Sequence, residues 1–265
     1  MALDFPRSFG PGLRDAVGGT SLVEVASDRG VALLRSDDGD QPRAVLHQRP
    51  PDTAPLLDQA DRLLWLAGRR PAPEVIAAGR ADEGDEAVVI RLGPHAASAE
   101  YGHPMGPEAL LNSLAEALSE LHEQPIEQCP FVADPASLRP VAAARIESGA
   151  VSVADDGPYI GREPSELATI FDGLVAGLPD DDAPVFVHGA LAPQRIWLDP
   201  SGEVTLLGWQ WSGVGDRHLD LAAGAALLSQ LHGPALVAPF IEAYGFDRVD
   251  LRRLDAYQLL AHLLS

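Results

Sequence analysis

Short apolar runs separated by polar turns fill the first ninety residues of the chain. Such runs, bounded by glycine, aspartate and proline, are typical of strands. Five of them occur, at residues 21–25, 30–35, 43–48, 74–78 and 87–92. One stretch, residues 56–68, instead repeats leucine and alanine at helical spacing and stops at Gly68. The first part of the chain is therefore predicted to be a mainly antiparallel sheet with one helix.

From residue 107 the apolar positions change to helical spacing. Pro107 suits the first turn of a helix, and leucines recur along the same face as far as His122. Three later segments show the same pattern, at residues 163–177, 219–231 and 249–264. Apolar runs at 185–187, 196–198 and 204–207 are expected to form a hairpin between these helices. This order predicts an α+β protein with a small strand-rich lobe, residues 1–92, and a larger mainly helical lobe, residues 93–265.

The composition favours an acidic protein of the cytoplasm. The formal net charge is −20, and nucleic acids and anionic lipids both require basic patches, so neither is an expected partner. We expect a small molecule or another protein as the partner; the charge could attract a polycation or could serve only solubility. No apolar run has the roughly 20 residues of a membrane span, and the first residues do not resemble a signal peptide. The single cysteine, Cys129, excludes an internal disulfide.

All 19 basic residues are arginines, and the chain contains no lysine. A lysine is a compact cation that shifts its pKa readily, and many phosphate sites depend on one. Its absence therefore bears on any phosphate chemistry assigned to this chain.

The second half carries a series of motifs in a recognisable order. The run Val187-His188-Gly189-Ala190, followed by Arg195 and an apolar strand, resembles the catalytic loop of the aminoglycoside phosphotransferases, whose pattern is His-Gly-Asp, four residues, then Asn. Residues 202–209 resemble the strand that leads to that family's metal-binding aspartate, and residues 213–222 resemble the loop after it. Residues 62–68 and 114–131 resemble segments of the 3′-phosphotransferase branch. The resemblance implies a two-lobed protein-kinase-like fold.

The resemblance also implies where the catalytic groups should be. Phosphoryl transfer depends on positioning and on neutralising charge, which this family achieves with a lysine, a helix glutamate, a loop aspartate, and an asparagine and an aspartate that bind magnesium. The loop aspartate position is Ala190, and the two metal-ligand positions are Arg195 and Gly208. The lysine position falls near His47 and the glutamate position on Gln59. All five catalytic positions are thus changed.

The same correspondence suggests which residues belong to the scaffold. Asp220 resembles the aspartate that braces the catalytic loop in kinase-like folds; a helix N-cap is the alternative. His188 is expected to be structural, because its usual aspartate neighbour is Ala190. Asp61 is close enough to Gln59 to be the alternative helix residue.

Other residues are candidates for binding. Gly19 and Ser21 lie in a stretch that resembles a shortened phosphate-covering loop, although two adjacent glycines are more often a plain turn between strands, and Arg91 lies where a hinge would meet a nucleotide base. Arg195 could bind a phosphate or carboxylate with its guanidinium, or could balance acidic neighbours or face solvent. The remaining candidates are Gln210 and, in a region that resembles the aminoglycoside-contacting segment, Asp155 and Asp156.

These changes favour a catalytically degenerate, pseudokinase-like protein that binds or regulates without transferring phosphate. One alternative is a divergent but active kinase that phosphorylates an alcohol group on an aminoglycoside or another small molecule, using His47 or His188 as a substitute. The other is an interaction protein whose cleft has filled in. We expect no cofactor: magnesium has no ligands, and any binding of ATP or GTP should be weak.

Overall fold

The computed structural model describes residues 2–3, 9–18, 22–28, 30–36, 43–49, 55–93, 95–101, 106–151, 161–177 and 183–264. Contacts between residues group the chain into two compact units. The first unit comprises Met1–Gly106 and Pro193–Gln210, and the second comprises Pro107–Ala192 and Trp211–Ser265.

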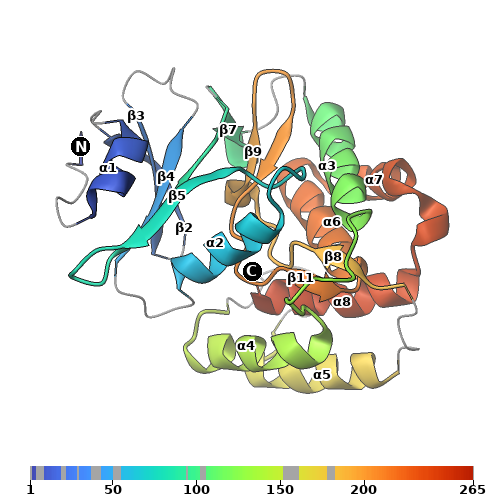
Figure 1. Ribbon diagram of the computed structural model, residues 1–265. Coiled ribbons are helices and arrows are strands. Elements are labelled where there is room, and N and C mark those ends of the chain that lie inside the picture. The colour runs from blue at the N-terminus through green and yellow to red at the C-terminus, as the bar shows by residue number, and fades with distance from the viewer. Residues whose placement is uncertain are drawn as a thin grey trace. The chain divides into compact units, whose positions relative to one another are not determined.

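An antiparallel sheet of six strands forms most of the first unit (Figure 1). Its strand order is β1-β2-β3-β4-β6-β5. The strands are β1 (Ala2–Leu3), β2 (Leu22–Asp28), β3 (Val31–Ser36), β4 (Ala44–Gln48), β5 (Val75–Arg80) and β6 (Glu86–Ile90). Gly30, with φ +77°, allows the tight turn between β2 and β3, because that backbone conformation carries no steric cost only for glycine.

Two helices accompany this sheet, where the sequence predicted one. The short helix α1 (Pro11–Val17) buries Leu13 and Val17 in a core with Leu34, Val45 and Val89. Because alternate residues of a strand face opposite sides, Leu46 and Val88 belong to the other face of the sheet. Ala87 belongs to the core under α1, so its neighbour Glu86 points to the second face. The helix α2 (Leu56–Trp65) lies on that second face, because the N–H of its residue Leu57 donates a hydrogen bond to Glu86.

The remainder of the first unit is a small sheet around the segment 193–210. The strands β9 (Ile196–Leu198) and β10 (Val204–Leu206) form a hairpin, and β7 (Ala97–Ser98) pairs with β9 on its other side. The 3-10 turn η1 (Ala99–Tyr101) directly follows β7, and the 3-10 turn η2 (Pro193–Arg195) directly precedes β9. The expected hairpin therefore exists over 196–206, but the run at 185–187 is not part of it.

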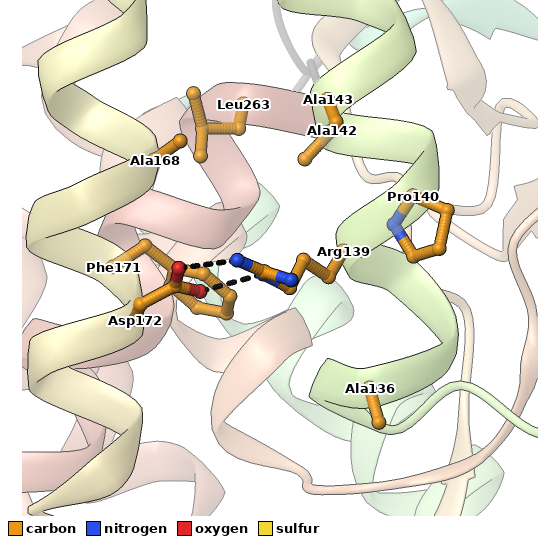
Figure 2. A pocket seen from close by; sticks show the side chains of 9 residues that line it. All are labelled: Ala136, Arg139, Pro140, Ala142, Ala143, Ala168, Phe171, Asp172 and Leu263. Atoms are coloured by element: carbon orange, nitrogen blue, oxygen red, sulfur yellow. Dashed lines mark hydrogen bonds and ion pairs between the residues drawn. The ribbon is translucent and has the colours of Figure 1, made fainter.

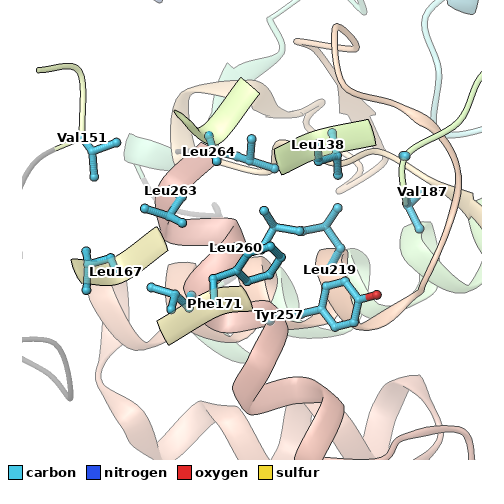
Figure 3. Packing of buried hydrophobic residues seen from close by; sticks show 14 of the residues in the cluster. Leu138, Val151, Leu167, Phe171, Val187, Leu219, Tyr257, Leu260, Leu263 and Leu264 are labelled. Atoms are coloured by element: carbon cyan, nitrogen blue, oxygen red, sulfur yellow. The ribbon is translucent and has the colours of Figure 1, made fainter. Parts of the chain in front are cut away.

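The second unit is mainly helical (Figures 1 and 3). Its helices are α3 (Pro107–His122), α4 (Pro135–Glu147), α5 (Pro164–Ala176), α6 (His218–His232), α7 (Val237–Tyr244) and α8 (Leu251–Leu264), with 3-10 turns η3 (Pro234–Leu236) and η4 (Phe246–Arg248). One ribbon of two strands, β8 (Val185–Val187) and β11 (Gly213–Gly215), lies among them. Leucines of α8 pack with Leu138 of α4, Phe171 of α5 and Leu219 of α6 to form the core drawn in Figure 3.

Most predicted elements are observed within a few residues, but three helices were not predicted. In α4, Pro140 lies inside the helix and interrupts the apolar pattern by which a helix is recognised. Asp134 nevertheless caps its start, accepting a hydrogen bond of 2.7 Å from the N–H of Ser137. The other two, α1 and α7, have only 7 and 8 residues, too few to show a helical period.

The contact-based units divide the chain differently from the predicted lobes. They meet at residue 106 instead of 92, and the first unit also includes 193–210. The physical reason lies in strand pairing, because β9 pairs with β7 and the N–H of Leu206 donates to the carbonyl of Pro71.

No helix among the described residues combines the length and the apolar character needed to cross a bilayer.

Candidate functional site

Two of the changed positions, Arg195 and Gly208, lie next to each other in the first unit. The β9–β10 hairpin brings them together, since Ile196 pairs with Leu206 and the N–H of Leu207 donates to the carbonyl of Arg195. Gly208 has a φ of +84°, and a Cβ added there would lie 2.6 Å from Cδ of Arg195. The arginine side chain therefore fills the space into which a residue at 208 would project.

The guanidinium of Arg195 forms an ion pair with Asp28 at the end of β2. Both Nε and Nη2 lie 2.6 Å from Oδ2 of Asp28. The Arg195 side chain is 2% exposed, whereas that of Asp28 is 27% exposed. The side chain of Arg195 is thus buried and paired with a carboxylate, and it does not face solvent. Asp28 was missed because an aspartate before Arg29-Gly30 reads simply as a turn residue.

Gln59, at the position of the helix glutamate, also contacts this segment. Its Oε1 accepts a hydrogen bond of 3.2 Å from the N–H of Trp209, and its side chain is buried. The indole of Trp209 is buried as well and donates to the carbonyl of Leu206 at 2.7 Å. Gln59 therefore holds the backbone directly after Gly208 in place. Its side chain is a neutral amide, so this hydrogen bond requires no cationic partner for Gln59.

His47 lies on the opposite face of the sheet from Gln59. In the register of β4 with β6, His47 pairs with Ala87, which belongs to the core under α1. Its Nε2 lies 2.9 Å from Oδ2 of Asp85, and its ring makes an edge contact with Phe9. The structure therefore does not bring His47 and Gln59 together.

The polar residue of β4 on the α2 face is Gln48, which the sequence analysis did not single out. It is buried and pairs in register with Glu86. Glu86, itself 1% exposed, accepts hydrogen bonds from the N–H of Leu57 and the guanidinium of Arg80. A carboxylate at the first turn of α2 is favoured by the exposed N–H groups and the helix dipole. Strand alternation was the signal that could have identified this face.

In the second unit, Asp220 organises the loop that contains His188 and Ala190. Its Oδ2 accepts from the N–H of His188 at 2.6 Å, and its Oδ1 accepts from the N–H of Gly189 at 2.8 Å. Asp220 lies inside α6, whose N-cap is Arg217. The aspartate therefore braces the loop instead of capping the helix.

Asp220 is kept ionised by its neighbours. Complete burial by itself would raise the pKa of this carboxyl, but the hydrogen bond and charge of His122, with His188 and the N–H of Gly189, hold the pKa below its ordinary value. The His122 ring lies 3.2 Å from Oδ2 through Nε2 and 2.8 Å from the hydroxyl of Tyr244 through Nδ1. The brace is thus part of a buried polar network.

His188 and Ala190 have structural surroundings. The His188 side chain is fully buried, and its Nδ1 accepts a hydrogen bond of 3.3 Å from the N–H of Ala190. Gly189 has a φ of +80°, and a Cβ there would lie 2.5 Å from the carbonyl oxygen of Trp211. The backbone of this loop is therefore tightly fixed, although the position of the catalytic base carries only a methyl group.

A second buried carboxylate, Asp216, was not singled out from the sequence. Its Oδ1 lies 2.5 Å from Nδ1 of His218, and its Oδ2 accepts from Arg253 at 2.6 Å. Burial would raise the pKa of Asp216, but the hydrogen bonds from His218 and Arg253 lower it below the ordinary value. The N–H of Asp250 donates to Nε2 of His218, so the imidazole links three elements. No simple spacing joins residues 216, 250 and 253, so the pattern did not reveal them.

Of the remaining candidates, two lie among the described residues. Arg91 is exposed and binds Glu74, with 2.7 Å between Nε and Oε2. Gln210 is half-buried at the end of the segment 193–210. Gly19, Ser21, Asp155 and Asp156 lie outside the described residues. Gly18, just before them, ends α1 with a φ of +84°.

A pocket in the second unit is lined by none of the motif residues (Figure 2). It has a volume of about 260 Å³ and is formed by α4, α5 and the last turn of α8. Its charged lining residues, Arg139 and Asp172, bind each other through two hydrogen bonds of 2.7 and 2.6 Å. The other lining side chains are apolar, and no polar group is directed at a ligand there, so this pocket offers no phosphate chemistry.

The residues present do not fit the magnesium ion that the resemblance implies. Magnesium requires oxygen ligands in near-octahedral geometry. At the two ligand positions the structure has a buried cation, Arg195, and a glycine whose side-chain space the arginine occupies. A guanidinium cannot ligate a metal and repels it. Among the described residues, no group of three or more His, Cys, Asp or Glu side chains is arranged to hold a metal ion.

Comparisons with known proteins agree with this arrangement of elements. Residues 21–257 match the model of the phosphotransferase enzyme family, APH. An aminoglycoside 3′-phosphotransferase of Streptomyces fradiae is 32% identical over 88% of this chain and 91% of its own, and a streptomycin 3″-kinase of Streptomyces griseus is 31% identical over 91% of each. The crystal structure of an aminoglycoside-3′-phosphotransferase of type VIII superposes with a TM-score of 0.74 at 29% identity, covering 95% of this chain and 96% of that one. The fold is the kinase-like fold of these enzymes, and the chain belongs to the aminoglycoside phosphotransferase (APH) family.

Proposed function

We propose that this member of the phosphotransferase family binds its ligand without transferring phosphate, as a pseudokinase with a binding or regulatory role. The observation that carries the proposal is the pair Arg195 and Gly208. Where the family motif has two metal ligands, this chain has a buried guanidinium and a residue without a side chain. Without the divalent cation, most of the charge neutralisation that drives phosphoryl transfer is lost.

The loss of the other groups supports the same function. Ala190 cannot accept a proton, and losing a general base alone typically costs about 10²–10⁴ in rate. The chain contains no lysine to position the phosphates. On the face of the sheet that bears α2, the polar residue of β4 is a neutral glutamine, Gln48.

The two histidines that could have served as substitutes are engaged elsewhere. His188 is fully buried, with Nδ1 bound to a backbone N–H. His47 binds Asp85 on the sheet face under α1, away from the face of Gln59. Neither arrangement favours the alternative of a divergent active kinase.

The test is an assay for phosphoryl transfer. The purified protein, with magnesium and ATP, should release no ADP in response to kanamycin, neomycin or streptomycin, whereas an active aminoglycoside 3′-phosphotransferase assayed in parallel should turn over. Aminoglycoside-dependent ADP release above the no-enzyme rate would overturn the proposal and establish the divergent kinase.

A second experiment restores the two metal ligands of the first unit. The variant Arg195→Asn with Gly208→Asp should acquire nucleotide binding that depends on magnesium. At a hundredfold excess of ligand over the Kd, binding adds about 2.7 kcal/mol of stability, which a thermal shift detects easily. Arg195→Asn with Gly208→Ala is the matched control and should show no magnesium dependence. An unchanged response in both variants would count against loss of the metal ligands as the reason for inactivity.

A further inference from the structure

The turn between β2 and β3 is tied to the altered metal-ligand position by one ion pair. Asp28, the last residue of β2, binds Arg195 with two nitrogens at 2.6 Å from the same oxygen, Oδ2. The amide nitrogen of Gln194 lies 3.5 Å from the other oxygen, Oδ1. The turn that follows holds Gly30, with φ +77°, so Asp28 lies at the point where the chain reverses direction into β3.

The edge of the guanidinium that Asp28 contacts is one that would serve a phosphate. Nε and Nη2 of an arginine form a planar fork that binds either a carboxylate or a phosphate through two N–H groups. Both groups are anions with similar oxygen geometry, so they cannot occupy the same edge together. A phosphate that approaches Arg195 from this side must first displace Asp28.

The two partners are held to different degrees. Arg195 is 2% exposed, and its Cδ lies against the backbone of Gly208. Asp28 is 27% exposed and lies beside a turn, outside the apolar cluster under α1. The carboxylate can therefore leave with little loss of packing, whereas the guanidinium remains in place.

We propose that Arg195 is an anion site that takes a polyphosphate chain without metal, and that Asp28 is its built-in competitor. The inference rests on the proposed function, because it replaces the magnesium ion with a fixed cation of the protein. The chemical class of the ligand is a di- or triphosphate, free or as part of a nucleotide.

The experiment measures binding of tripolyphosphate and of ATP, both in EDTA, by calorimetry on the full chain. Asp28→Asn keeps the shape of the side chain and removes the competing charge, so both affinities should rise about tenfold or more. Asp28→Ser removes the same charge and covers the case in which asparagine disturbs the turn. Equal gains for ATP and tripolyphosphate assign recognition to the phosphates, and a larger gain for ATP assigns a nucleotide.

Asp85→Asn is the matched control. It removes the same charge from the same unit, but Asp85 binds His47 on the α1 face of the sheet. Its effect on both affinities should stay within about twofold. In the double variant Asp28→Asn with Arg195→Gln, the gain should disappear.

Three results would overturn the inference. The first is that Asp28→Asn and Asp28→Ser show no gain in affinity although their melting temperatures show a folded protein. The second is that Asp85→Asn gains as much affinity as Asp28→Asn. The third is that the gain in affinity persists in the double variant with Arg195→Gln. Each leaves the proposed function standing, because that function fails only if the wild-type protein phosphorylates a substrate. Conversely, phosphoryl transfer by the wild type would not alter the competition measured in EDTA.

Discussion

The loop at 188–190 and the segment at 195–208 carry parts of the same family motif, yet they differ in what they retain. In the second unit Asp220 still holds the backbone of His188 and Gly189 through two short hydrogen bonds. In the first unit Arg195 and Gly208, at the positions that match the two metal ligands of the family motif, pack against each other. The backbone of the loop at 188–190 is thus firmly braced, whereas the residues at the two metal-ligand positions offer no oxygen ligand for a metal.

The difference indicates that different physical requirements constrain the residues of the two regions. A buried carboxylate that accepts two backbone N–H groups cannot be lost without leaving those donors unsatisfied. A metal ligand, in contrast, can be replaced once another cation balances the local charge. Arg195 supplies that cation, and Asp28 supplies its counter-charge.

The largest effect is expected from removing the brace. Asp220→Ala would leave the N–H groups of His188 and Gly189 and the ring of His122 without their buried acceptor, at a cost of about 3–5 kcal/mol. Urea denaturation measures the loss. Asp255→Ala, at an exposed position of α8, is the control and should change stability by less than about 0.5 kcal/mol. A small effect of Asp220→Ala would remove the contrast between the two regions.

A smaller effect is expected where the two replaced residues fit together. Gly208→Ala should destabilise the protein by about 1–3 kcal/mol, because its φ is +84° and its Cβ would meet Cδ of Arg195 at 2.6 Å. Gly68→Ala is the control. Gly68 has a φ of +76° but no atom within 4 Å of the added Cβ, so this variant should show only the stability cost of the strained backbone conformation.

The steric part can be isolated by a double-mutant cycle. Arg195→Ala should relieve the clash, so the cost of Gly208→Ala should be lower in that background. Additive costs would mean that Gly208 and Arg195 do not depend on each other.

An effect of similar size, distinguished by its pH dependence, is expected in the second unit. The pKa of Asp216 is lowered in the folded state, so its contribution to stability is present above the unfolded carboxyl pKa, about 4, and is lost as the pH falls through the folded value. Asp216→Asn should cost about 1–3 kcal/mol at pH 7. The difference from wild type should shrink as the pH falls below about 4, which urea titrations at several pH values would measure. If the difference in stability between Asp216→Asn and wild type stayed constant with pH, the charge of Asp216 would not be the source of its contribution to stability.

The sequence predicted most of the fold, because helical and strand periods are local. It predicted α3 to the residue and five of the six strands of the first sheet within a few residues. It missed the short strand β1 and the three helices of short or interrupted pattern, α1, α4 and α7. It also predicted the family, which the comparisons confirm over residues 21–257. The proposed loss of activity remains a prediction of the altered motif.

Tertiary structure decided the contacts between residues that are distant in the chain. Whether His47 or Gln48 faces α2 depends on strand register, and a shift of one residue exchanges the two faces. That Arg195 would bind Asp28, 167 positions earlier, could not be read from either segment alone. A motif specifies which side chains are present, but the partner of a buried charge is set by whatever the folded chain brings within hydrogen-bonding distance.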